Sequence, residues 1–564
     1  MKYKNWDVRG FNRDEAVKLC NAGINPLVSV FLTSRGVTCP DKAKKLIDEN
    51  ESELHDPYLM KGMSEAVSRI RQAVANAEKV ALYGDYDVDG MTSCALLALW
   101  LRTKNIEYDI YIPGRTDEGY GLNITALDFL KSRGASLVIT SDCGVTAFEE
   151  ADYAGKIGLD LIITDHHECK EQLPSAVAVV NPKRHDCSYP NKNLSGVGVV
   201  FKLLCALEQD CSSLSLLDTY SDLVAIGTIA DVMSVLGENR TFIKHGLKRI
   251  NQNPRLGLSK LLGNDINKDG TVDAVSIGYI LAPKLNAPGR MGRSQLSIDL
   301  LLTEDENEAN ALAQELSQLN LDRRSLEAEI LKEAEAALTK STSVVDKPIV
   351  LASRGWYQGV AGIVAAKMAE RYHLPAVIIT IDKDGIGKGS CRSYGGFNIF
   401  SALSSCSDIL TNFGGHEMAA GITIDEDKID MLRAKLAELY SSTDSSDNPS
   451  LKLDFEVEKP QLLTVQNLLA LNSLKPFGSG NLAPGLCVKN VKLSSLYPVG
   501  GGRHTKVKLQ KADHMFDAIY FSMPTENLSF KDGDNVDIAF EPHINTFRGH
   551  SSVQLQIIDI RAAV

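Results

Sequence analysis

The chain has 564 residues, of which 44% are hydrophobic and 23% are charged. At roughly 100–200 residues per domain, this length suggests about three or four domains. No apolar run reaches the ~18 residues that a membrane-spanning helix needs, and the first residues form no apolar signal-peptide core, so we expect a cytoplasmic protein. The net charge of −12 argues mildly against nucleic acid as a partner. A site for two divalent cations must nevertheless be acidic before the metal binds.

The cysteines point to a reducing environment. None of the eleven forms a CxxC pair, and several, such as Cys94 and Cys205, lie in apolar stretches. This pattern fits reduced, buried thiols better than a disulfide framework or a structural zinc site.

The sequence of residues 1–55 predicts a short helical lead-in, a segment ahead of the first domain that contains few candidate functional residues. From 56 to 303, short β-branched runs alternate with segments of helical composition, such as 92–103 and 124–133. This alternation predicts a mostly parallel, doubly wound α/β sheet. The clearest expected strands are Lys79–Tyr83, Ser136–Thr140 and Leu159–Thr164.

Residues 304–342 are assigned to one long helix, because 304–340 contain no Gly or Pro and are rich in strong helix formers. This helix either connects two domains or packs on its own domain. A second α/β unit follows at 343–445, with expected strands at 348–352 and 376–381. A helix is expected between these strands.

The polar stretch at 441–450 is typical of a linker. Residues 451–564 alternate apolar and polar positions and contain Gly-rich turns, which predicts a small OB-like β-barrel. The expected fold class is therefore α/β multidomain: a doubly wound parallel-sheet domain, a second α/β domain joined by a long helix, and a C-terminal β-barrel.

Four groups of acidic or histidine residues each follow a run that we interpret as a strand. The carboxyl ends of strands in an open α/β sheet form the ligand-binding crevice, so these side chains are expected to converge. Carboxylates and imidazoles suit Mn²⁺ or Mg²⁺ better than a thiolate zinc site. Two such ions ~3.5–4 Å apart can clamp a phosphate, one activating water and the other stabilising the leaving oxygen. The groups are Asp85, Asp87 and Asp89; Asp142; Asp165, His166 and His167; and Asp231.

Each group has a simpler interpretation. Residues 85–90 match the start of an EF-hand calcium loop, but the twelfth position is Leu96 instead of Glu. A similar match at 265–270 is better explained as a solvated turn. Asp142, taken alone, could be a helix N-cap, and Asp231 has a similar structural alternative. Adjacent histidines point in different directions, so one of them could be structural. The joint occurrence of all four groups favours a metal site.

The motifs GDYDVDG (84–90), SDCG (141–144), TDHHE (164–168) and GTIADV (227–232) together resemble the DHH phosphoesterase family. GKGSCRS (387–393) and FGGHEMAAG (413–421) are similar to its associated second domain. The order and spacing from about residue 55 to 425 look specifically like the family's bacterial single-strand exonucleases.

The resemblance implies residue roles at the metal site. Asp165 is expected to orient a neighbouring histidine, as carboxylate partners of metal-bound imidazoles do. His416 is similar to the family histidine that faces the scissile phosphate and hydrogen-bonds to the developing charge. Asp85 is a weaker candidate for the metal site. The implied ligands of two Mn²⁺ or Mg²⁺ ions are Asp87, Asp89, Asp142, His166, His167 and Asp231.

Substrate contacts are implied in two places. Arg115, Ser390 and Arg392 match the family's pocket for a 5′-terminal phosphate, with Arg290 as a further DNA contact. Arginine suits this role because it makes bidentate, charge-assisted bonds to phosphate. An OB-like barrel binds single strands through stacking and backbone contacts. Candidates in the barrel are Tyr497, Arg503, Lys506, Lys508, Tyr520 and Arg548.

The resemblance therefore implies a single-stranded-DNA-specific 5′→3′ exonuclease that releases 5′-mononucleotides in DNA recombination and repair. Single-stranded DNA is the expected partner, with single-strand-binding protein and repair helicases as further candidates, and we expect a monomer. One alternative is an oligoribonuclease or cyclic-dinucleotide phosphodiesterase of the same superfamily, against which the tail at 451–564 argues. Another is a non-catalytic nucleic-acid-binding scaffold, against which the four intact motifs argue.

Overall fold

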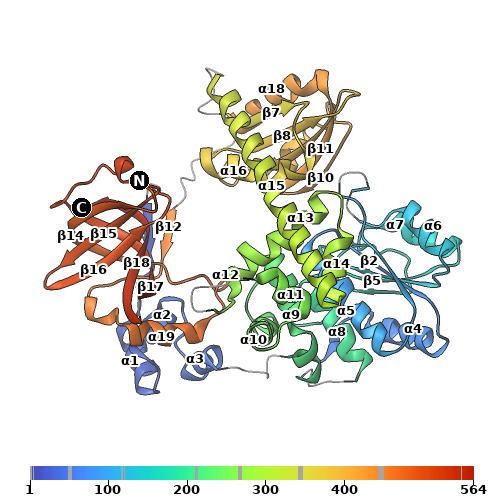
Figure 1. The fold of residues 1–564 in the computed structure, drawn as a ribbon, viewed down its shortest axis with the longest axis horizontal. Coiled ribbons are helices and arrows are strands. Elements are labelled where there is room, and N and C mark those ends of the chain that lie inside the picture. Colours follow the sequence, from blue (N-terminus) through green and yellow to red (C-terminus); the bar gives the residue numbers. More distant parts are fainter. Residues whose placement is uncertain are drawn as a thin grey trace. The chain divides into compact units, whose positions relative to one another are not determined.

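The protein forms two compact units in the computed structural model, one from residues 51–445 and the other from 1–50 together with 446–564 (Figure 1). In the part of the chain that the structure describes, no helix is long and apolar enough to cross a membrane. The described residues are 3, 5–48, 54–115, 118–119, 121–209, 214–263, 270–340, 347–442, 450–547 and 549–563.

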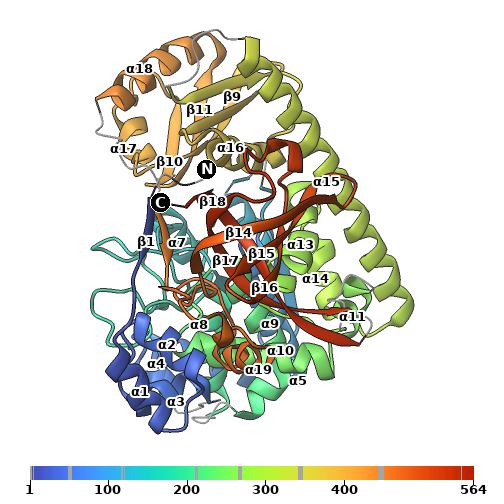
Figure 2. The ribbon, with the colours of Figure 1, turned by 90° about the vertical axis from the view of Figure 1, so that its left-hand side faces the viewer.

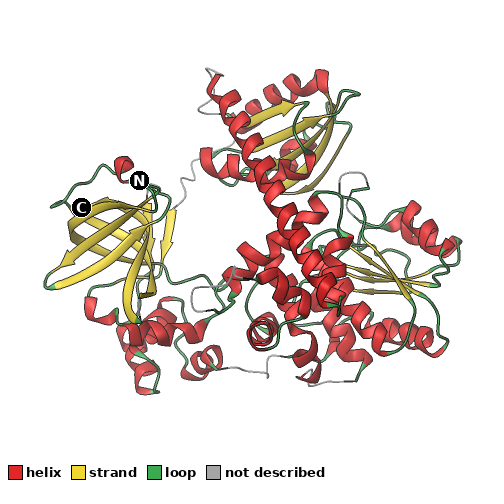
Figure 3. Ribbon diagram, in the orientation of Figure 1, coloured by secondary structure: helices red, strands yellow, loops and turns green. Residues whose placement is uncertain are grey.

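The first sheet of the larger unit has five parallel strands in the order β3-β2-β4-β5-β6. Successive side chains of a strand point to opposite faces. Leu82 and Ile139 accordingly pack with the helices of one face, and Tyr83 and Val138 with those of the other. Figure 3 shows the strands of this sheet lying between helices. The predicted doubly wound parallel sheet is confirmed. The strands are β2 (Val80–Gly84), β3 (Tyr108–Tyr111), β4 (Leu137–Ser141), β5 (Asp160–Thr164) and β6 (Ala178–Val180).

Helices cover both faces of this sheet. One core contains α4, α5 and α8, and the core on the opposite face contains α6 and α7. A 3₁₀ turn, η2 (Pro57–Leu59), precedes the first of them. Their bounds are α4 (Met63–Ala75), α5 (Val88–Thr103), α6 (Ile124–Ser132), α7 (Phe148–Lys156) and α8 (Gly196–Leu207).

Between α8 and residue 302, most of the described residues lie in further helices. The run that ends at Asp231 was interpreted as a strand, and this was wrong, because it is the second half of helix α9 (Leu214–Ala230). Residues 220–228 are buried at every position, and the apolar run at 223–226 is too short to show a helical period, so it cannot be distinguished from a buried strand. The other elements are α10 (Glu238–Gln252), α11 (Leu256–Leu262), α12 (Ala274–Ser276), the π-helix η3 (Ile277–Leu281), α13 (Ala282–Arg290) and α14 (Gln295–Leu302).

The long helix α15 spans Glu306–Lys340 (Figure 2). In its first half, Ala313 and Leu316 belong to the core that contains the first sheet. In its second half, Ile330 and Ala334 pack with α16 and the second sheet. The helix is therefore shared between two cores, which favours the connecting role over a helix that packs on one domain alone.

The second sheet has the order β10-β11-β9-β8-β7, with only β7 and β8 parallel. Helices α15 and α16 cover one face, and α17 and α18 cover the other. A 3₁₀ turn, η4 (Glu426–Lys428), precedes α18. The elements are β7 (Ile349–Ser353), α16 (Gln358–Tyr372), β8 (Ala376–Ile381), β9 (Ile386–Arg392), α17 (Ile399–Ser404), β10 (Asn412–His416), β11 (Ala419–Asp425) and α18 (Ile429–Ser441).

The smaller unit contains the predicted barrel. Its strands follow the order β13-β14-β15-β16-β18-β17, and β17 pairs again with β14, which closes the sheet on itself. The predicted β-barrel is therefore confirmed. The strands are β13 (Phe455–Glu456), β14 (Leu486–Val499), β15 (His504–Lys511), β16 (His514–Tyr520), β17 (Asn535–Phe547) and β18 (His550–Ala562).

Residues 5–47 belong to the barrel unit, whereas the sequence suggested only a lead-in to the first α/β domain. Strand β1 (Asn5–Val8) pairs in parallel with β12 (Ser450–Leu453). The Trp6 indole donates a hydrogen bond of 3.0 Å to Asp559 and lies under the Arg561 guanidinium, 4.2 Å from the ring centroid. The helices are α1 (Arg13–Asn21), α2 (Pro26–Ser34), α3 (Pro40–Ile47) and α19 (Val465–Leu471), with the 3₁₀ turns η5 (Pro460–Leu462), η6 (Asn472–Leu474) and η7 (Thr525–Asn527).

Candidate metal centre

Acidic and histidine side chains gather where β2, β4 and β5 end and where α9 ends. The parallel register places the carboxyl ends of these strands side by side, and α9 packs against α5, which starts at the same edge. In each of three groups, one potential ligand atom per residue lies within 4.8 Å of the others. The groups are Asp142, His166 and His167; Asp89, His166 and Asp231; and Asp85, Asp87 and Asp142. The structure thus brings together every residue that the sequence proposed for the metal site.

His166 is at the middle of this cluster. Its Nε2 atom lies 2.9 Å from Asp142 Oδ1, 3.4 Å from Asp231 Oδ2 and 3.9 Å from Asp89 Oδ2. Burial lowers the pKa of His166 to about 3, so the ring is neutral near pH 7. A neutral imidazole that faces several carboxylates is a suitable metal ligand.

The carboxylates of the cluster crowd one another. Burial, and then the charge of Asp87, raises the pKa of Asp231 to about 7. Burial and the neighbouring carboxylates also raise the pKa values of Asp89 and Asp142 well above the usual range for aspartate. Asp85 Oδ1 is buried and has no hydrogen-bond partner among the described residues. So many buried carboxylates are costly without cations, and oxygen and imidazole donors fit two divalent ions.

Asp87 and Asp142 differ in their local structure. Asp87 is the N-cap of α5, because its Oδ1 accepts hydrogen bonds from the backbone N–H groups of Asp89 and Gly90 at 2.9 and 3.1 Å. Asp142 is not a cap. It follows β4 with left-handed backbone (φ 65°), which is uncommon for a residue other than glycine and is frequent at functional sites.

Asp165 is hydrogen-bonded by its surroundings on both oxygens. Oδ2 accepts from the Val145 backbone at 2.9 Å, and Oδ1 accepts from the backbone N–H groups of His166 and His167. Burial, the largest single effect, would raise the pKa of Asp165, but the hydrogen bond and the charge of His167 together with the backbone hydrogen bonds lower it. Burial would likewise lower the pKa of His167, yet Asp165 raises it to about 9. This is the geometry expected of a carboxylate that orients a metal-binding imidazole.

Three arginines come together near the second sheet. The Arg115 guanidinium lies 4.7 Å from the centroid of the Tyr86 ring. Burial, and then the charge of Arg115, lowers the pKa of Arg290 to about 9 and also lowers that of Arg392. Among the described residues, no carboxylate forms an ion pair with Arg115, Arg290 or Arg392. Unpaired guanidinium groups that repel one another form a site for an anion.

Ser390 lies beside Arg392 on β9. A Cβ atom on Gly362 of α16 would lie 3.2 Å from Arg392 Nη2 and 3.5 Å from Ser390 Oγ, so both side chains reach the same point of this helix. Arg290 connects to the same helix, because its Nη1 donates to the Gly359 carbonyl at 3.2 Å. The structure therefore gathers all four residues proposed for substrate binding.

Comparisons with known proteins agree with this geometry. Family models match residues 79–228 (DHH family, N-terminal domain), 346–442 (DHHA1 domain) and 453–559 (RecJ OB domain). The single-stranded-DNA-specific exonuclease RecJ of Bacillus subtilis (strain 168) is 38% identical over 562 residues, which are 98% of this chain and 70% of that protein. The chain belongs to the RecJ family. It is accordingly a metal-dependent nuclease.

Other RecJ proteins extend the comparison. That of Escherichia coli (strain K12) is 32% identical over 568 residues, which are 96% of each chain. The crystal structure of RecJ in complex with Mn²⁺ from Thermus thermophilus matches with a TM-score of 0.84 at 28% identity, covering 99% of this chain and 80% of that one. A structure of exonuclease RecJ bound to manganese matches with a TM-score of 0.60 at 33% identity, covering 68% and 96%.

Other residues suggested by the RecJ resemblance have mixed outcomes. His416 is exposed at the end of β10, and within the described part of the chain no hydrogen bond or ion pair joins it to the metal cluster. In the barrel, Tyr497, Arg503 and Lys508 are exposed and Lys506 is partly so. Tyr520 is 7% exposed and part of the barrel core, so it is not a surface contact. Arg548 lies outside the described residues.

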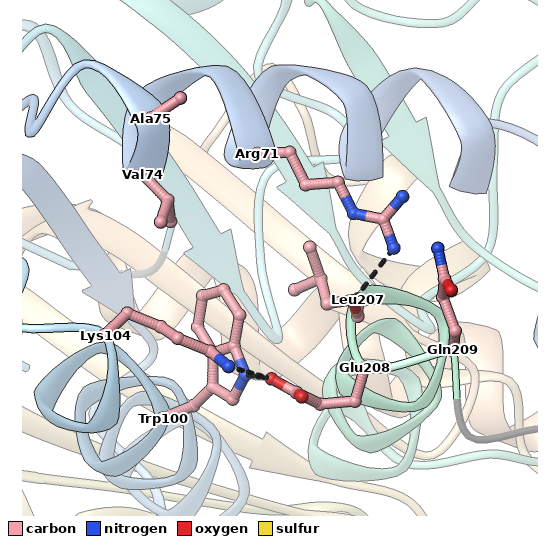
Figure 4. A pocket seen from close by; sticks show the side chains of 8 residues that line it. All are labelled: Arg71, Val74, Ala75, Trp100, Lys104, Leu207, Glu208 and Gln209. Atoms are coloured by element: carbon pink, nitrogen blue, oxygen red, sulfur yellow. Dashed lines mark hydrogen bonds and ion pairs between the residues drawn. The ribbon is translucent and has the colours of Figure 1, made fainter.

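A cavity of about 460 Å³ lies between α4, α5 and α8 (Figure 4). Its polar groups are already paired: Trp100 Nε1 and Lys104 Nζ each lie 2.6 Å from Glu208 Oε1, and Arg71 donates to backbone carbonyls. Trp100 is about 16 Å along α5 from Asp89, at 1.5 Å per residue. The cavity is therefore separate from the metal centre of this RecJ-family chain.

The groups that surround Asp89 include residues that the sequence does not mark as part of the site. Residues 195–201 (SGVGVVF) are typical of a tight loop before a packed helix, and Ser195 does cap α8. The backbone N–H groups of Gly196 and Val197 point at the Asp89 carboxylate, at 2.6 and 2.9 Å. The signal was a serine followed by alternating glycines, which marks a helix start but does not show what it faces.

Proposed function

We propose that this RecJ-family nuclease degrades single-stranded DNA in the 5′→3′ direction. The observation that carries the proposal is the position of His166 Nε2 within 4 Å of three carboxylates, beside a separate cluster of arginines in the same unit. The relatives in Bacillus subtilis and Escherichia coli are named single-stranded-DNA-specific exonucleases.

The proposed metal ions are two Mn²⁺ or Mg²⁺, since RecJ from Thermus thermophilus was solved in complex with each. Asp85 joins the proposed site because of its burial and its unpaired Oδ1. Such a pair of ions would polarise the phosphate, supply an activated water and stabilise the leaving oxygen. The proposed ligands are Asp87, Asp89, Asp142, His166, His167 and Asp231.

The chain's own residues would orient the substrate. Asp165 holds the His167 ring through Nδ1, which would leave Nε2 to bind a metal ion. Arg115, Arg392 and Ser390 would hold the terminal 5′-phosphate, together with Arg290, which donates to the Gly359 carbonyl of α16. Because the 5′ end of the strand would be bound at a fixed distance from the metal site, cleavage would start at that end, and this would set the polarity. His416 would donate a hydrogen bond to the scissile phosphate when substrate is bound.

The parts of the chain would divide this work. Residues 56–303 are proposed as the DHH phosphoesterase domain, 304–342 as the connecting helix, 343–445 as the DHH-associated domain and 451–564 as the nucleic-acid-binding barrel. Release of 5′-mononucleotides by a monomer during DNA recombination and repair, beside single-strand-binding protein and a helicase, is the proposed cellular role.

The test uses single-stranded DNA with a 5′-phosphate and a 3′-label, incubated with Mn²⁺, and the same strand in a blunt duplex. We expect loss of nucleotides from the 5′ end, sparing of the duplex, and no activity for Asp142→Ala. The matched control is Asp152→Ala, an exposed aspartate on α7, which should cleave like the unmodified chain.

Three results would contradict the proposal. Full activity of Asp142→Ala would refute the assigned metal site. Loss from the 3′ end would refute the polarity. Turnover of dinucleotides without cleavage of long strands would move the chain to the oligoribonuclease or cyclic-dinucleotide class.

A further inference from the structure

The N-terminal turn of α8 holds one carboxylate of the metal cluster. Asp89 is 1% exposed, and both of its oxygens accept backbone hydrogen bonds, Oδ2 from Gly196 at 2.6 Å and Oδ1 from Val197 at 2.9 Å. The first N–H groups of a helix have no partner within the helix and carry partial positive charge. The first two N–H groups of α8 therefore bind the two carboxylate oxygens of Asp89.

The same turn also sets the place of Asp142, which follows a different strand. A Cβ atom on Gly196 would lie 2.6 Å from Asp142 Cβ and 3.0 Å from its Cα and Cγ. Real Cβ atoms essentially never approach so closely, and the backbone of Asp142 cannot swing away as the end of a flexible side chain could. Gly196 thus donates its N–H group to Asp89, and because it has no side chain it leaves room for Asp142.

Helix α9 also packs closely against the Asp89 carboxylate. A Cβ atom on Gly227 would lie 2.7 Å from Asp89 Oδ1. The hydroxyl groups of Ser195 and Thr228 form a buried hydrogen bond of 2.9 Å, which ties the start of α8 to the helix that ends beside Asp231. Asp89 is therefore held between two helices, and one of them leads to a further candidate ligand.

We propose that the turn Ser195–Val197 is a backbone clamp that fixes the spacing between Asp89 and Asp142, with Gly196 as a positioning residue of the metal centre. The inference rests on the proposed metal site. A carboxylate offers about four lone-pair sites, and the two amides occupy one on each oxygen, which leaves others directed at the cluster. Residues that orient ligands in this way typically change metal affinity by about 10–100-fold when they are mutated.

The experiment compares two glycine substitutions in one helical turn. Gly196→Ala keeps the N–H group but adds the Cβ atom that collides with Asp142. Gly198→Ala is the matched control, because a Cβ atom there would meet its nearest neighbours, Leu194 Cδ2 and Ser195 Oγ, at an ordinary 3.4 Å. Mn²⁺ binding to each full-length, metal-free protein is titrated by electron paramagnetic resonance, and folding is checked by circular dichroism and thermal unfolding.

We expect Gly196→Ala to remain folded and to bind Mn²⁺ at least about 10-fold more weakly, whereas Gly198→Ala binds it normally. A folded Gly196→Ala protein with unchanged Mn²⁺ affinity overturns the proposal. If Gly196→Ala does not fold, Ser195→Ala decides, since it removes the cap and the bond to Thr228 without adding an atom. A severalfold loss of Mn²⁺ affinity is then expected, and an unchanged affinity refutes the clamp.

The measurement separates this inference from the proposed function. If the unmodified chain binds Mn²⁺ but does not cleave single-stranded DNA, the proposed function fails and the clamp can still be tested. If it binds no Mn²⁺, the proposed metal site fails and the clamp with it.

Discussion

His167 Nδ1 donates a hydrogen bond of 2.8 Å to Asp165 Oδ1, and the same carboxylate is fixed by three backbone N–H groups. The lowered pKa of Asp165 keeps it ionised and therefore an acceptor only. Asp165 therefore keeps a proton on Nδ1. Because the pKa of His167 is raised to about 9, the metal-free ring also carries a proton on Nε2 at neutral pH, and a metal ion that binds there would displace it.

Asp165→Asn should weaken Mn²⁺ binding by about 10–100-fold, because the amide no longer fixes the tautomer and orientation of His167. Calorimetric titration of the metal-free protein with Mn²⁺ measures the change. Asp160→Asn, at the other end of β5, is the control and should bind Mn²⁺ normally. Equal affinities for the two variants would refute the orienting role.

The sequence predicted the three strand ends correctly because β2, β4 and β5 are short β-branched runs, each followed directly by its polar residues. Asp231 lies in the cluster that the sequence proposed, but it was assigned to the wrong element, since the buried half of α9 has no exposed polar face to reveal its period. The contact of β1 with the barrel could not be predicted, because Trp6 and Asp559 lie 553 positions apart and no local pattern connects them. The role of Gly196 depends on an approach between the first turns of α5 and α8 and the end of β4, which residue types alone do not show.

The metal-free protein should lose stability as the pH rises from about 6.5 to 8. Burial raises the pKa of Asp231 to about 7, and an aspartate in the unfolded chain titrates near pH 3.9. Between these values the folded state binds more protons than the unfolded state, so the free energy of unfolding falls with rising pH. His167, whose pKa is raised to about 9, lowers the free energy of unfolding further as the pH rises above 6.5. His166, whose pKa is lowered to about 3, has the opposite effect, but only below pH 6.5.

Thermal unfolding in EDTA at several pH values measures this effect, which is at most about 1.4 kcal/mol per pH unit for each proton. Asp231→Asn should flatten the dependence, and Mn²⁺ should restore stability at pH 8. A metal-free protein whose unfolding temperature rises over this range would contradict the prediction.

Arg392→Ala should reduce kcat/KM for a 5′-phosphorylated strand by about 10–100-fold, since a charge-assisted bond to phosphate contributes about 1.5–3 kcal/mol. Cleavage of a strand with a 5′-hydroxyl group should change little, because this substrate never makes the bond. Arg354→Ala, an exposed arginine of the same domain, is the control. Equal losses on both substrates would mean that Arg392 does not bind the terminal phosphate.

Trp6→Ala should destabilise the barrel unit by about 2 kcal/mol, because it removes an indole that binds Asp559 and stacks on Arg561. Urea unfolding of the full chain, followed by circular dichroism, measures the loss. Val17→Ala, at a position that is 56% exposed, should have little effect. Mn²⁺ affinity should be the same in both variants, since the metal centre is in the other unit.

The pairing of β1 with β12 has a consequence for how the protein is made. The ribosome completes β1 and α1–α3 first, then synthesises the whole of residues 51–445, and only afterwards reaches the strands that these early elements need. At about 5–20 residues per second, the nascent N-terminal segment waits roughly 20–90 s for its partners. The nuclease centre can thus be complete while the barrel is still being translated. The apolar faces of α1 and α2 are the part of the nascent chain that most needs a chaperone.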